Sequence, residues 1–256
     1  MPHIHSVDIG LCRIDTASMD SAIEYIRQMQ RNKHAGYIVT PNVDHLARLA
    51  RKDDTGSLQH IYRNASLSLC DSRILEALLN RHGTKIPQVV TGSDLTRRLF
   101  ESELNSKDRI YILGGEDDVI NIVRDRFPYL GITHHNPTMG FINKSDEVKK
   151  VIDNILGAQP DFVFLAVGSP QQEKLALMLK QQARFHGIAL CIGASILFLA
   201  DKEKRAPKWM QHSRLEWLYR LLQNPTRLTK RYIQNALVLP RINRMLAQSV
   251  AEPAAN

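Results

Sequence analysis

The chain has 256 residues, a formal net charge of +8 and three cysteines, which is long enough to bury a core as one large domain or two lobes. Cys12, Cys70 and Cys191 follow no CxxC or Cys/His spacing, so neither a disulfide framework nor a structural zinc site is indicated, and reduced thiols fit the cytoplasm. No signal peptide opens the chain and no apolar run approaches the roughly 20 residues that span a bilayer, so we expect no integral membrane protein.

The first elements predict a strand, a helix and a second strand. Residues 6–14 alternate in polarity like a strand, and residues 18–30 carry apolar side chains at helical spacing. The strand over residues 36–39 runs into Thr40-Pro41-Asn42, so Thr40 and Asn42 stand at its carboxyl end. Both residue types commonly cap helices, and spacing alone favours that role here.

A third short strand, residues 66–70, ends at Asp71 before a predicted helix that includes Leu75 and Leu79. Asp71 stands where Asp and Ser cap helices. A carboxylate at the mouth of a parallel sheet can equally serve as a general base. The position in the sequence leaves both roles open.

Two glycines follow the strand predicted for residues 109–113 and precede a helix over residues 118–126. Gly114 and Gly115 would let a ligand approach the backbone closely. The acidic residues after them disfavour a bare phosphate at the helix, so we expect a nucleoside there.

The stretch from residue 160 to 180 combines a strand, a tight turn and a helix. In a parallel sheet such a turn lies at the carboxyl edge of the strands, and the helix offers unpaired N–H groups to an anion. An ordinary capped loop explains the stretch equally well, because it is neither a Walker loop nor a G-x-G-x-x-G fingerprint. The candidates for phosphate contact are Gly168, Pro170, Gln171, Gln172 and Glu173.

Strands and helices alternate from residue 5 to about residue 200, ending with a strand over residues 188–192. This alternation predicts an α/β fold with a Rossmann-like parallel sheet core, as one doubly wound sheet or two lobes. We divide the chain into a core, residues 1–200, and a helical appendage, residues 201–256. The adjacent pair His134 and His135 diverges on a strand, so no metal site is expected.

The appendage carries most of the positive charge. Residues 201–256 hold eleven Lys and Arg against four Asp and Glu, which is +7 of the total +8. A basic amphipathic tail can lie on an anionic bilayer, or its guanidinium groups can clamp a diphosphate. A solvated helical extension and a nucleic-acid contact are the alternatives.

Six motifs together resemble the WecG/TagA/CpsF glycosyltransferase family. They are TPNVDH at 40–45, the strand-end Asp71, TGSDL at 91–95, YILGG at 111–115, PDFVFLAVGSPQQE at 160–173 and KRAPKWMQHSRLEWLYRLLQNPTRLTKRY at 204–232. They cover most of the chain in the family's order, and the last two are long enough to be specific.

The resemblance implies an inverting, metal-independent hexosyltransferase that uses no cofactor. It would move N-acetylmannosamine, its uronic acid or glucose from a UDP donor to an undecaprenyl-diphosphate-linked acceptor, in surface polysaccharide or teichoic acid biosynthesis. The protein would sit peripherally on the cytoplasmic face of the membrane, held by its basic tail. The Trp and Leu face of that tail also suits a homo-oligomer; nucleic acid is not an expected partner.

Carried over residue by residue, the resemblance makes Asp71 the catalytic base and Thr40 its polar partner at the reacting centre, with Asn42 beside them. The substrate-binding positions it implies are Gly114, Gly115, Gly168, Pro170, Gln172 and Glu173 on the nucleotide side, and Arg214, Arg220, Arg227 and Arg231 in the appendage.

Two positions depart from the family pattern. Ser72 follows Asp71 where the family usually has glycine, which adds bulk near the site. Many members also carry an arginine shortly before the TGSDL motif, where this chain reads Gln88-Val89-Val90. A missing cation there leaves the identity of the sugar, or of a charged acceptor group, open.

A basic adaptor that binds membrane or nucleic acid without catalysis would explain the charge but not the polar strand ends. A nicotinamide-dependent oxidoreductase would need G-x-G-x-x-G after the first strand, which is absent. The transferase hypothesis depends on one geometric expectation: Thr40 and Asp71 converge on a single cleft whose far wall is the turn around Gly168.

Overall fold

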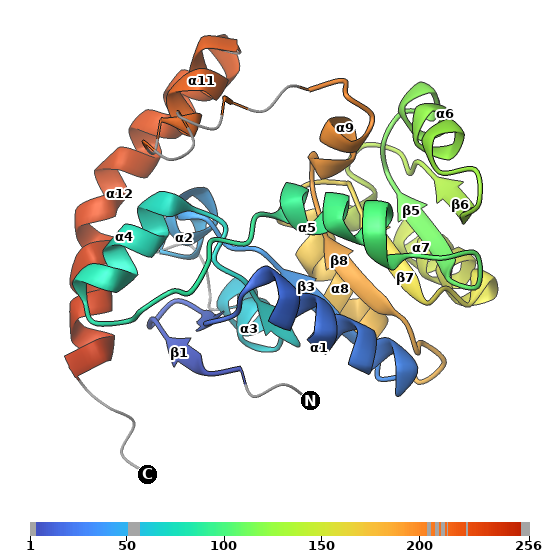
Figure 1. The fold of residues 1–256 in the computed structure, drawn as a ribbon, viewed down its shortest axis with the longest axis horizontal. Helices are drawn as coiled ribbons and strands as arrows, with labels where there is room; N and C mark the ends of the chain where they lie inside the picture. Colours follow the sequence, from blue (N-terminus) through green and yellow to red (C-terminus); the bar gives the residue numbers. More distant parts are fainter. Residues whose placement is uncertain are drawn as a thin grey trace.

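Six parallel strands form the central sheet, in the order β4-β3-β8-β7-β5-β6 (Figure 1). The computed structural model describes residues 4–50, 57–203, 206–207, 210, 213, 215–223 and 225–251. The strands are β3 (Gly36–Val39), β4 (Leu67–Ser68), β5 (Arg109–Leu113), β6 (Gly131–His135), β7 (Phe162–Leu165) and β8 (Ile188–Cys191). The predicted Rossmann-like α/β core is therefore confirmed, and it is built on one central sheet.

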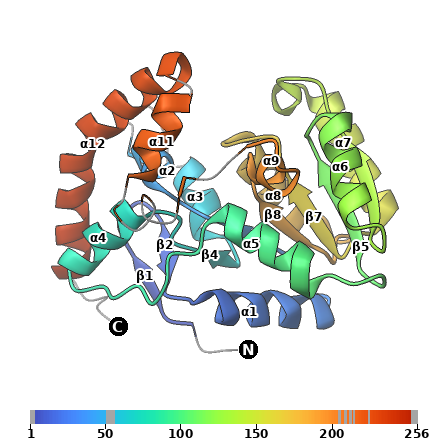
Figure 2. The same ribbon diagram turned by 45° about the horizontal axis from the view of Figure 1, so that its top comes forward.

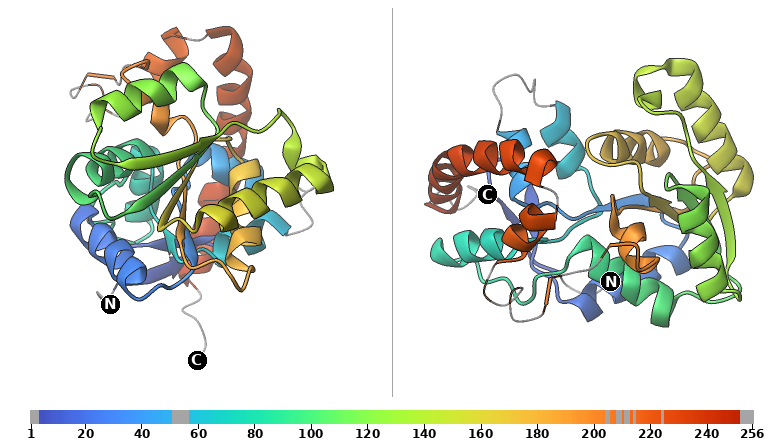
Figure 3. Two further views of the ribbon diagram at one scale, coloured as in Figure 1. Left: turned by 90° about the vertical axis from the view of Figure 1, so that its right-hand side faces the viewer. Right: turned by 90° about the horizontal axis from the view of Figure 1, so that it is seen from above.

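Successive residues along each strand point alternately into two buried layers, one on each face of the sheet. In β7, Val163 and Leu165 face one layer while Phe162 and Phe164 face the other. Helices cover both faces (Figure 3). The first layer packs under α2 (Val43–Leu49), α3 (Ser57–Arg63), α4 (Arg73–Arg81), α7 (Ser145–Ala158) and α8 (Gln171–Lys180); the second packs under α1 (Met19–Arg31), α5 (Gly92–Arg98), α6 (Asp117–Arg126) and α9 (Ser195–Leu199).

The single strand predicted over residues 6–14 is wrong. The segment forms an antiparallel hairpin of β1 (Ser6–Asp8) and β2 (Arg13–Asp15). Gly10 reverses the chain with a φ of +78°, and its N–H donates to Asp8 Oδ1 at 2.7 Å. The alternating polarity continues across this turn, so periodicity alone does not reveal it.

The strand order reverses between β5 and β7. From β5 the chain passes through α6, on one face of the sheet, to its neighbour β6. From β7 it passes through α8, on the other face, to β8, which lies in the opposite direction along the sheet. In open α/β sheets such a reversal opens a crevice at the carboxyl ends of the strands, where ligands bind. The turns that contain Gly114 and Gly168 both lie at this point of the sheet.

The described residues after the core include the helices α11 (Glu216–Gln223) and α12 (Pro225–Ala251). The long helix α12 runs beside α2 and α4 (Figure 2). Ile242 and Leu246 of α12 are fully buried in the first layer, and Trp217 of α11 packs edge-on against Tyr232 at a centroid distance of 6.0 Å. The helical character predicted for this part is confirmed, and its division from the core at residue 200 stays a prediction.

Among the described residues, every helix is either too short or too polar to cross a bilayer. Within the same residues, no three His, Cys, Asp or Glu side chains gather as a metal-ligand set. Cys12, Cys70 and Cys191 are buried free thiols.

Candidate functional site

Backbone hydrogen bonds beyond the ends of β3 and β4 bring three polar loops together. The Asp71 N–H donates to the Pro41 carbonyl at 3.1 Å, which holds the loop after β4 beside the loop after β3. The Val90 N–H donates to the Cys70 carbonyl at 3.0 Å and adds the segment that leads into α5. These bonds are made by the main chain, so the placement of the loops depends little on side-chain rotamers.

Thr40, Asp71 and Ser195 converge around Gly92, the first residue of α5. The Gly92 N–H donates to Asp71 Oδ2 at 3.0 Å. A Cβ built on Gly92 would lie 3.1 Å from Thr40 Oγ1, 3.4 Å from Ser195 Oγ and 3.7 Å from Asp71 Oδ2. The expected convergence of Thr40 and Asp71 is therefore present, and Ser195 from the start of α9 joins them.

The two capping interpretations have different outcomes. Asn42 is the N-cap of α2, where its side-chain oxygen accepts from the N–H groups of Asp44 at 3.0 Å and His45 at 3.2 Å. Asp71 does not cap α4, because Ser72 takes that position and accepts from the Leu75 N–H at 3.2 Å. Capping by Ser72 leaves the Asp71 carboxylate to face Gly92.

The two turns at the strand-order reversal use their glycines differently. Gly114, with φ +89°, packs so closely that a Cβ would lie 2.9 Å from Val167 Cγ1 and 3.0 Å from the Ala166 carbonyl oxygen. Close packing between the ends of β5 and β7 thus explains Gly114 without a ligand. Gly168, with φ +78°, has no atom within 4 Å of the same position. Of these two glycines, Gly168 is the one that leaves open space.

Gly115 is held by packing and by a histidine. Its φ is +86°, and a Cβ there would lie 3.3 Å from Ile120. His134 Nε2 lies 3.1 Å from the Gly115 carbonyl oxygen, while His134 Nδ1 lies 3.3 Å from Asp117 Oδ1. His134 therefore braces the turn after β5 against α6.

Gln172 and Glu173 point into the protein, with exposed fractions of 4% and 1%. Gln172 Oε1 accepts from the Gly193 N–H at 2.9 Å, and Gln172 Nε2 donates to Glu173 Oε1 at 3.0 Å. The Tyr62 hydroxyl also donates to Glu173 Oε1, at 3.1 Å. In this structure the two side chains join α8 to the ends of β8 and α3, while Pro170 stands at the N-cap position of α8.

Sequence reasoning missed two residues of α2: His45, whose ring centroid lies 6.0 Å from that of Tyr62, and Arg48, which reaches the turn after β7. His45 Nδ1 accepts from the Asn42 N–H at 3.2 Å. Burial lowers the pKa of His45 below its usual value, and the opposing effect of Glu173 does not restore it. Arg48 donates to Ser169 Oγ at 2.7 Å, in the turn after β7. The signal for His45 was its place three residues after the N-cap Asn42, where capping-box partners stand.

Arg231 docks α12 onto α2. Its Nε lies 2.8 Å from Asp44 Oδ1, and Asn235 donates to the same oxygen at 3.2 Å. Burial would raise the pKa of Asp44, but Arg231 and Arg48 outweigh burial and hold it below its ordinary value. Of the other predicted arginines, Arg214 and the side chains of Arg220 and Arg227 lie outside the described residues.

The two departures from the family pattern have local structural roles. Ser72 caps α4, and Gln88 Oε1 accepts from the Met19 N–H at 2.8 Å, at the start of α1. Gln88 therefore serves α1 in this structure.

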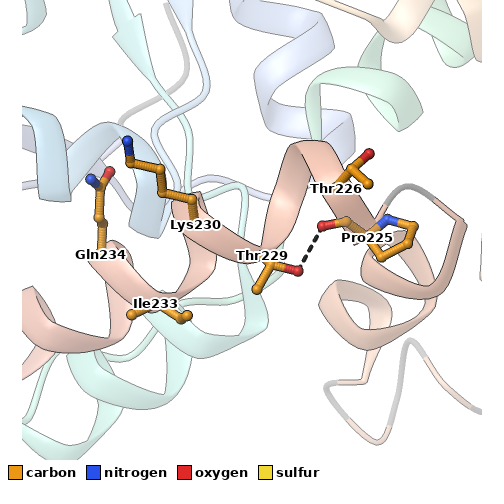
Figure 4. A pocket seen from close by; sticks show the side chains of 6 residues that line it. All are labelled: Pro225, Thr226, Thr229, Lys230, Ile233 and Gln234. Carbon is orange, nitrogen blue, oxygen red and sulfur yellow. Dashed lines mark hydrogen bonds between the residues drawn. The ribbon is translucent and has the colours of Figure 1, made fainter.

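A surface groove on α12 is separate from these strand ends (Figure 4). All of its lining belongs to α12, and Thr229 Oγ1 is tied back to the Pro225 carbonyl at 2.6 Å. The groove is lined by Pro225, Thr226, Thr229, Lys230, Ile233 and Gln234.

The chain is an α/β protein whose parallel sheet reverses its strand order, with polar side chains gathered at its carboxyl edge, where such sheets commonly bind ligands. The sequence model of the family described as "Glycosyl transferase WecG/TagA/CpsF family" matches residues 7–251. The chain belongs to this family, and it is a glycosyltransferase.

Several similar proteins carry one name, N-acetylglucosaminyldiphosphoundecaprenol N-acetyl-beta-D-mannosaminyltransferase. The protein of Bacillus subtilis (strain 168) is 25% identical over 215 residues, which cover 82% of this chain and 81% of that protein. The protein of Staphylococcus aureus (strain MW2) is 23% identical over 228 residues, covering 87% and 86%. A Bacillus spizizenii protein is 31% identical over a shorter stretch of 148 residues, covering 57% and 56%.

Proposed function

We propose that this glycosyltransferase moves an N-acetylmannosamine-type sugar from a UDP donor to a polyprenyl-diphosphate-linked acceptor, with inversion and without a metal ion. The uronic acid of that sugar and glucose are the alternative donors to test. The observation that carries the proposal is the convergence of Thr40 Oγ1 and Asp71 Oδ2 beside Gly92, at the carboxyl edge of the sheet. The names of the relatives support the acceptor class.

In the proposed reaction an acceptor hydroxyl attacks the anomeric carbon from the face opposite UDP. Asp71 takes the hydroxyl proton as the new C–O bond forms, and the bond from the anomeric carbon to the UDP oxygen breaks. UDP leaves with the bonding electron pair. Thr40 orients the reacting groups, and Asn42 lies beside it in the same loop. Because the hydroxyl attacks opposite the leaving UDP, this single displacement inverts the anomeric centre.

We assign the donor's nucleotide to the surface beyond the carboxyl ends of β5 and β7, on the side of the turn that contains Gly168. The open space beside Gly168 supports this assignment, together with the reversal of strand order at these strands. Gly114 and Gly115 shape the neighbouring turn. In this proposal Arg214, Arg220 and Arg227 carry the cationic stabilisation of the leaving diphosphate, while Arg231, which is paired with Asp44, holds α12 in place.

The lipid-linked acceptor requires contact with a membrane, and α12 presents a suitable face. Ile233 and Leu237 are 56% and 75% exposed. Lys230, Arg241 and Arg244 are also exposed and fall on the same side of the helix by their spacing. An apolar strip flanked by cations suits the surface of an anionic bilayer. We therefore propose a peripheral protein on the cytoplasmic face of the membrane, with residues 201–256 as its membrane and substrate appendage.

The direct test is transfer from UDP-N-acetylmannosamine to a short-chain lipid-diphosphate N-acetylglucosamine in solution, with UDP-N-acetylmannosaminuronic acid and UDP-glucose as competing donors. Asp71→Asn should lower turnover about 10²–10⁴-fold, the usual effect of losing a general base. UDP affinity, measured by calorimetry, should stay near that of the unmodified protein. Asp125→Asn, which changes an exposed carboxylate on α6, is the control and should leave turnover unchanged.

Near-normal turnover by Asp71→Asn would remove Asp71 from the role of base. Transfer from none of the three donors would refute the proposed substrate class while leaving the family assignment in place.

A further inference from the structure

Gly92 occupies a position where the backbone does not demand glycine. Its φ lies outside the left-handed region, and it is the buried first residue of α5. Glycine within a helix is less favourable than alanine by up to about 1 kcal/mol. The reason for glycine at this position is therefore the limited space for a side chain, and not the backbone conformation.

The space beside Gly92 is bounded by three oxygen atoms from three different loops. A methyl group would lie 3.1 Å from Thr40 Oγ1, closer than ordinary van der Waals contact, and would also face Ser195 Oγ and Asp71 Oδ2. Thr40 and Ser195 are 8% and 6% exposed, so neither hydroxyl can swing freely into solvent. An added side chain would displace the Thr40 hydroxyl or fill the space that the oxygens face.

The same residue also fixes the carboxylate. The Gly92 N–H donates to Asp71 Oδ2 at 3.0 Å. The Ser195 hydroxyl donates to the Ile192 carbonyl at 2.6 Å, so toward Gly92 its oxygen can only accept. Asp71 Oδ2 and Ser195 Oγ are therefore two hydrogen-bond acceptors that face one small space. A hydroxyl group that enters this space can donate its proton to either of them.

We propose that Gly92 is a positioning residue for the transfer reaction. Its amide holds the Asp71 carboxylate, and its missing side chain lets Thr40, Ser195 and Asp71 face the place where the acceptor hydroxyl loses its proton. This inference rests on the proposed role of Asp71 and adds the group that aims it.

Two substitutions separate the contribution of the space from that of the amide. Gly92→Ala keeps the N–H and adds only a methyl group. Gly92→Pro adds a ring and also removes the N–H that serves Asp71. Proline is favoured at the first position of a helix, and Thr91 already has the extended conformation, φ −76° and ψ 150°, that a residue before proline adopts. Both variants should therefore fold.

For Gly92→Ala we expect kcat to fall about 10²-fold, the scale of loss from a small misplacement of reacting groups. The affinity for UDP should stay unchanged, and the fraction of folded protein at the assay temperature should stay close to that of the unmodified protein. For Gly92→Pro we expect a larger fall, and the acidic limb of the pH–rate profile should move to higher pH, because an amide that donates to a carboxylate favours its ionised form. Gly157→Ala is the control, since Gly157 lies exposed in α7 with nothing within 4 Å of its Cβ position.

The two levels of the proposal fail in different ways. If Asp71→Asn is inactive while Gly92→Ala and Gly92→Pro turn over normally, Gly92 is not a positioning residue and the proposed base survives. If Asp71→Asn is itself active, the proposed function fails first. A fall in kcat that is matched by an equal loss of folded protein would also overturn the inference, because Gly92 would then have a merely structural role.

Discussion

The cluster around Gly92 and the outer face of α12 are built in contrasting ways. At the cluster, main-chain bonds such as that from the Asp71 N–H to the Pro41 carbonyl place the loops, and Thr40 is only 8% exposed. On α12, Leu237 is 75% exposed, and the helix is held by side chains, including Arg231 on Asp44. The cluster around Gly92 has a fixed geometry, whereas the outer face of α12 presents an exposed apolar surface.

Under the proposed function, this contrast separates two tasks: transferring the sugar and reaching an acceptor that is held in a membrane. Moving a sugar needs reacting atoms held within a fraction of an ångström, which main-chain bonds between packed strands provide. Meeting a membrane needs exposed apolar area and positive charge, without exact geometry. Substitutions in the two regions should therefore fail in different assays, and that difference can be measured.

The largest effect is expected at the cluster. Thr40→Val keeps the shape of the side chain and removes its hydroxyl, so turnover should fall about 10²-fold, as when one polar group is lost from a reacting centre. The loss should be equal with a water-soluble acceptor analogue and with acceptor in vesicles, because the chemical step is affected in both. Steady-state transfer with UDP-N-acetylmannosamine measures it.

Thr138→Val is the matched control, since Thr138 is an exposed residue far along the chain that bonds Glu147 and lies outside the strand-end cluster. A Thr40→Val protein with undiminished turnover would separate the cluster from the chemistry.

The second effect is expected on α12 and only with vesicles. Leu237→Glu removes an apolar contact with the bilayer worth about 1.5 kcal/mol, so binding to vesicles that contain anionic phospholipid should weaken about ten-fold. Turnover of the water-soluble acceptor should not change. Met139→Glu is the control, because Met139 is 97% exposed outside α12. Equal losses for the two substitutions would show that α12 has no special part in membrane binding.

A smaller effect is expected at the junction of the two regions. Asp44→Asn removes the charge that pairs with Arg48 and Arg231, each at 2.8 Å. Arg231 is half exposed, so solvent weakens the pair, and we expect the free energy of unfolding in urea to fall by about 1 kcal/mol. The pKa of Asp44 is lowered on folding, so this contribution is present at neutral pH and is lost as the pH falls below its ordinary value.

Glu147→Gln, which removes the surface pair with Lys144, should change stability less. Equal stability of Asp44→Asn and the unmodified protein would show that the charge of Asp44 is not needed to hold α12, which would leave the apolar packing at Ile242 and Leu246 and the contact between His82 and Asn243.

The sequence predicted the parts of the fold that depend on local pattern. Residues 36–39 were predicted as a strand and form β3, because a short apolar run buried on both faces has a clear signature. The meeting of Thr40 and Asp71 was predictable as well, since the carboxyl ends of parallel strands share one edge of a sheet.

What the sequence could not predict depends on partners far along the chain. Asp71 and Ser72 are both good capping residues, and contacts from distant segments, such as the Gly92 N–H on Asp71 Oδ2, accompany the choice of Ser72 as the cap of α4. Likewise Gln172 and Glu173 point inward, where Gln172 accepts a hydrogen bond from the Gly193 N–H and Glu173 accepts one from the Tyr62 hydroxyl. The hairpin of β1 and β2 was missed because its turn interrupts an otherwise regular alternation.

The smallest expected effect concerns His45, which stands between the two regions, and it appears in the pH dependence of stability. Burial lowers the pKa of His45 below its ordinary value of 6.5, with Glu173 and Asp44 opposing burial and Arg48 and Arg231 assisting it. Below that value the unfolded chain binds a proton that the folded protein does not, so the free energy of unfolding should fall as the pH drops from 7 toward 5.

His45→Gln tests this with the cap preserved, because glutamine is a usual partner at this position of a capping box and can accept from the Asn42 N–H as His45 Nδ1 does. Glutamine does not titrate, so the variant should lose less stability than the unmodified protein over the same pH interval, measured by urea unfolding at each pH. Carboxylates elsewhere contribute equally to both proteins and cancel in the difference. Parallel pH profiles would mean that His45 takes up its proton as readily in the folded protein as in the unfolded chain, and the junction between α2 and the strand-end cluster would then not depend on a neutral imidazole.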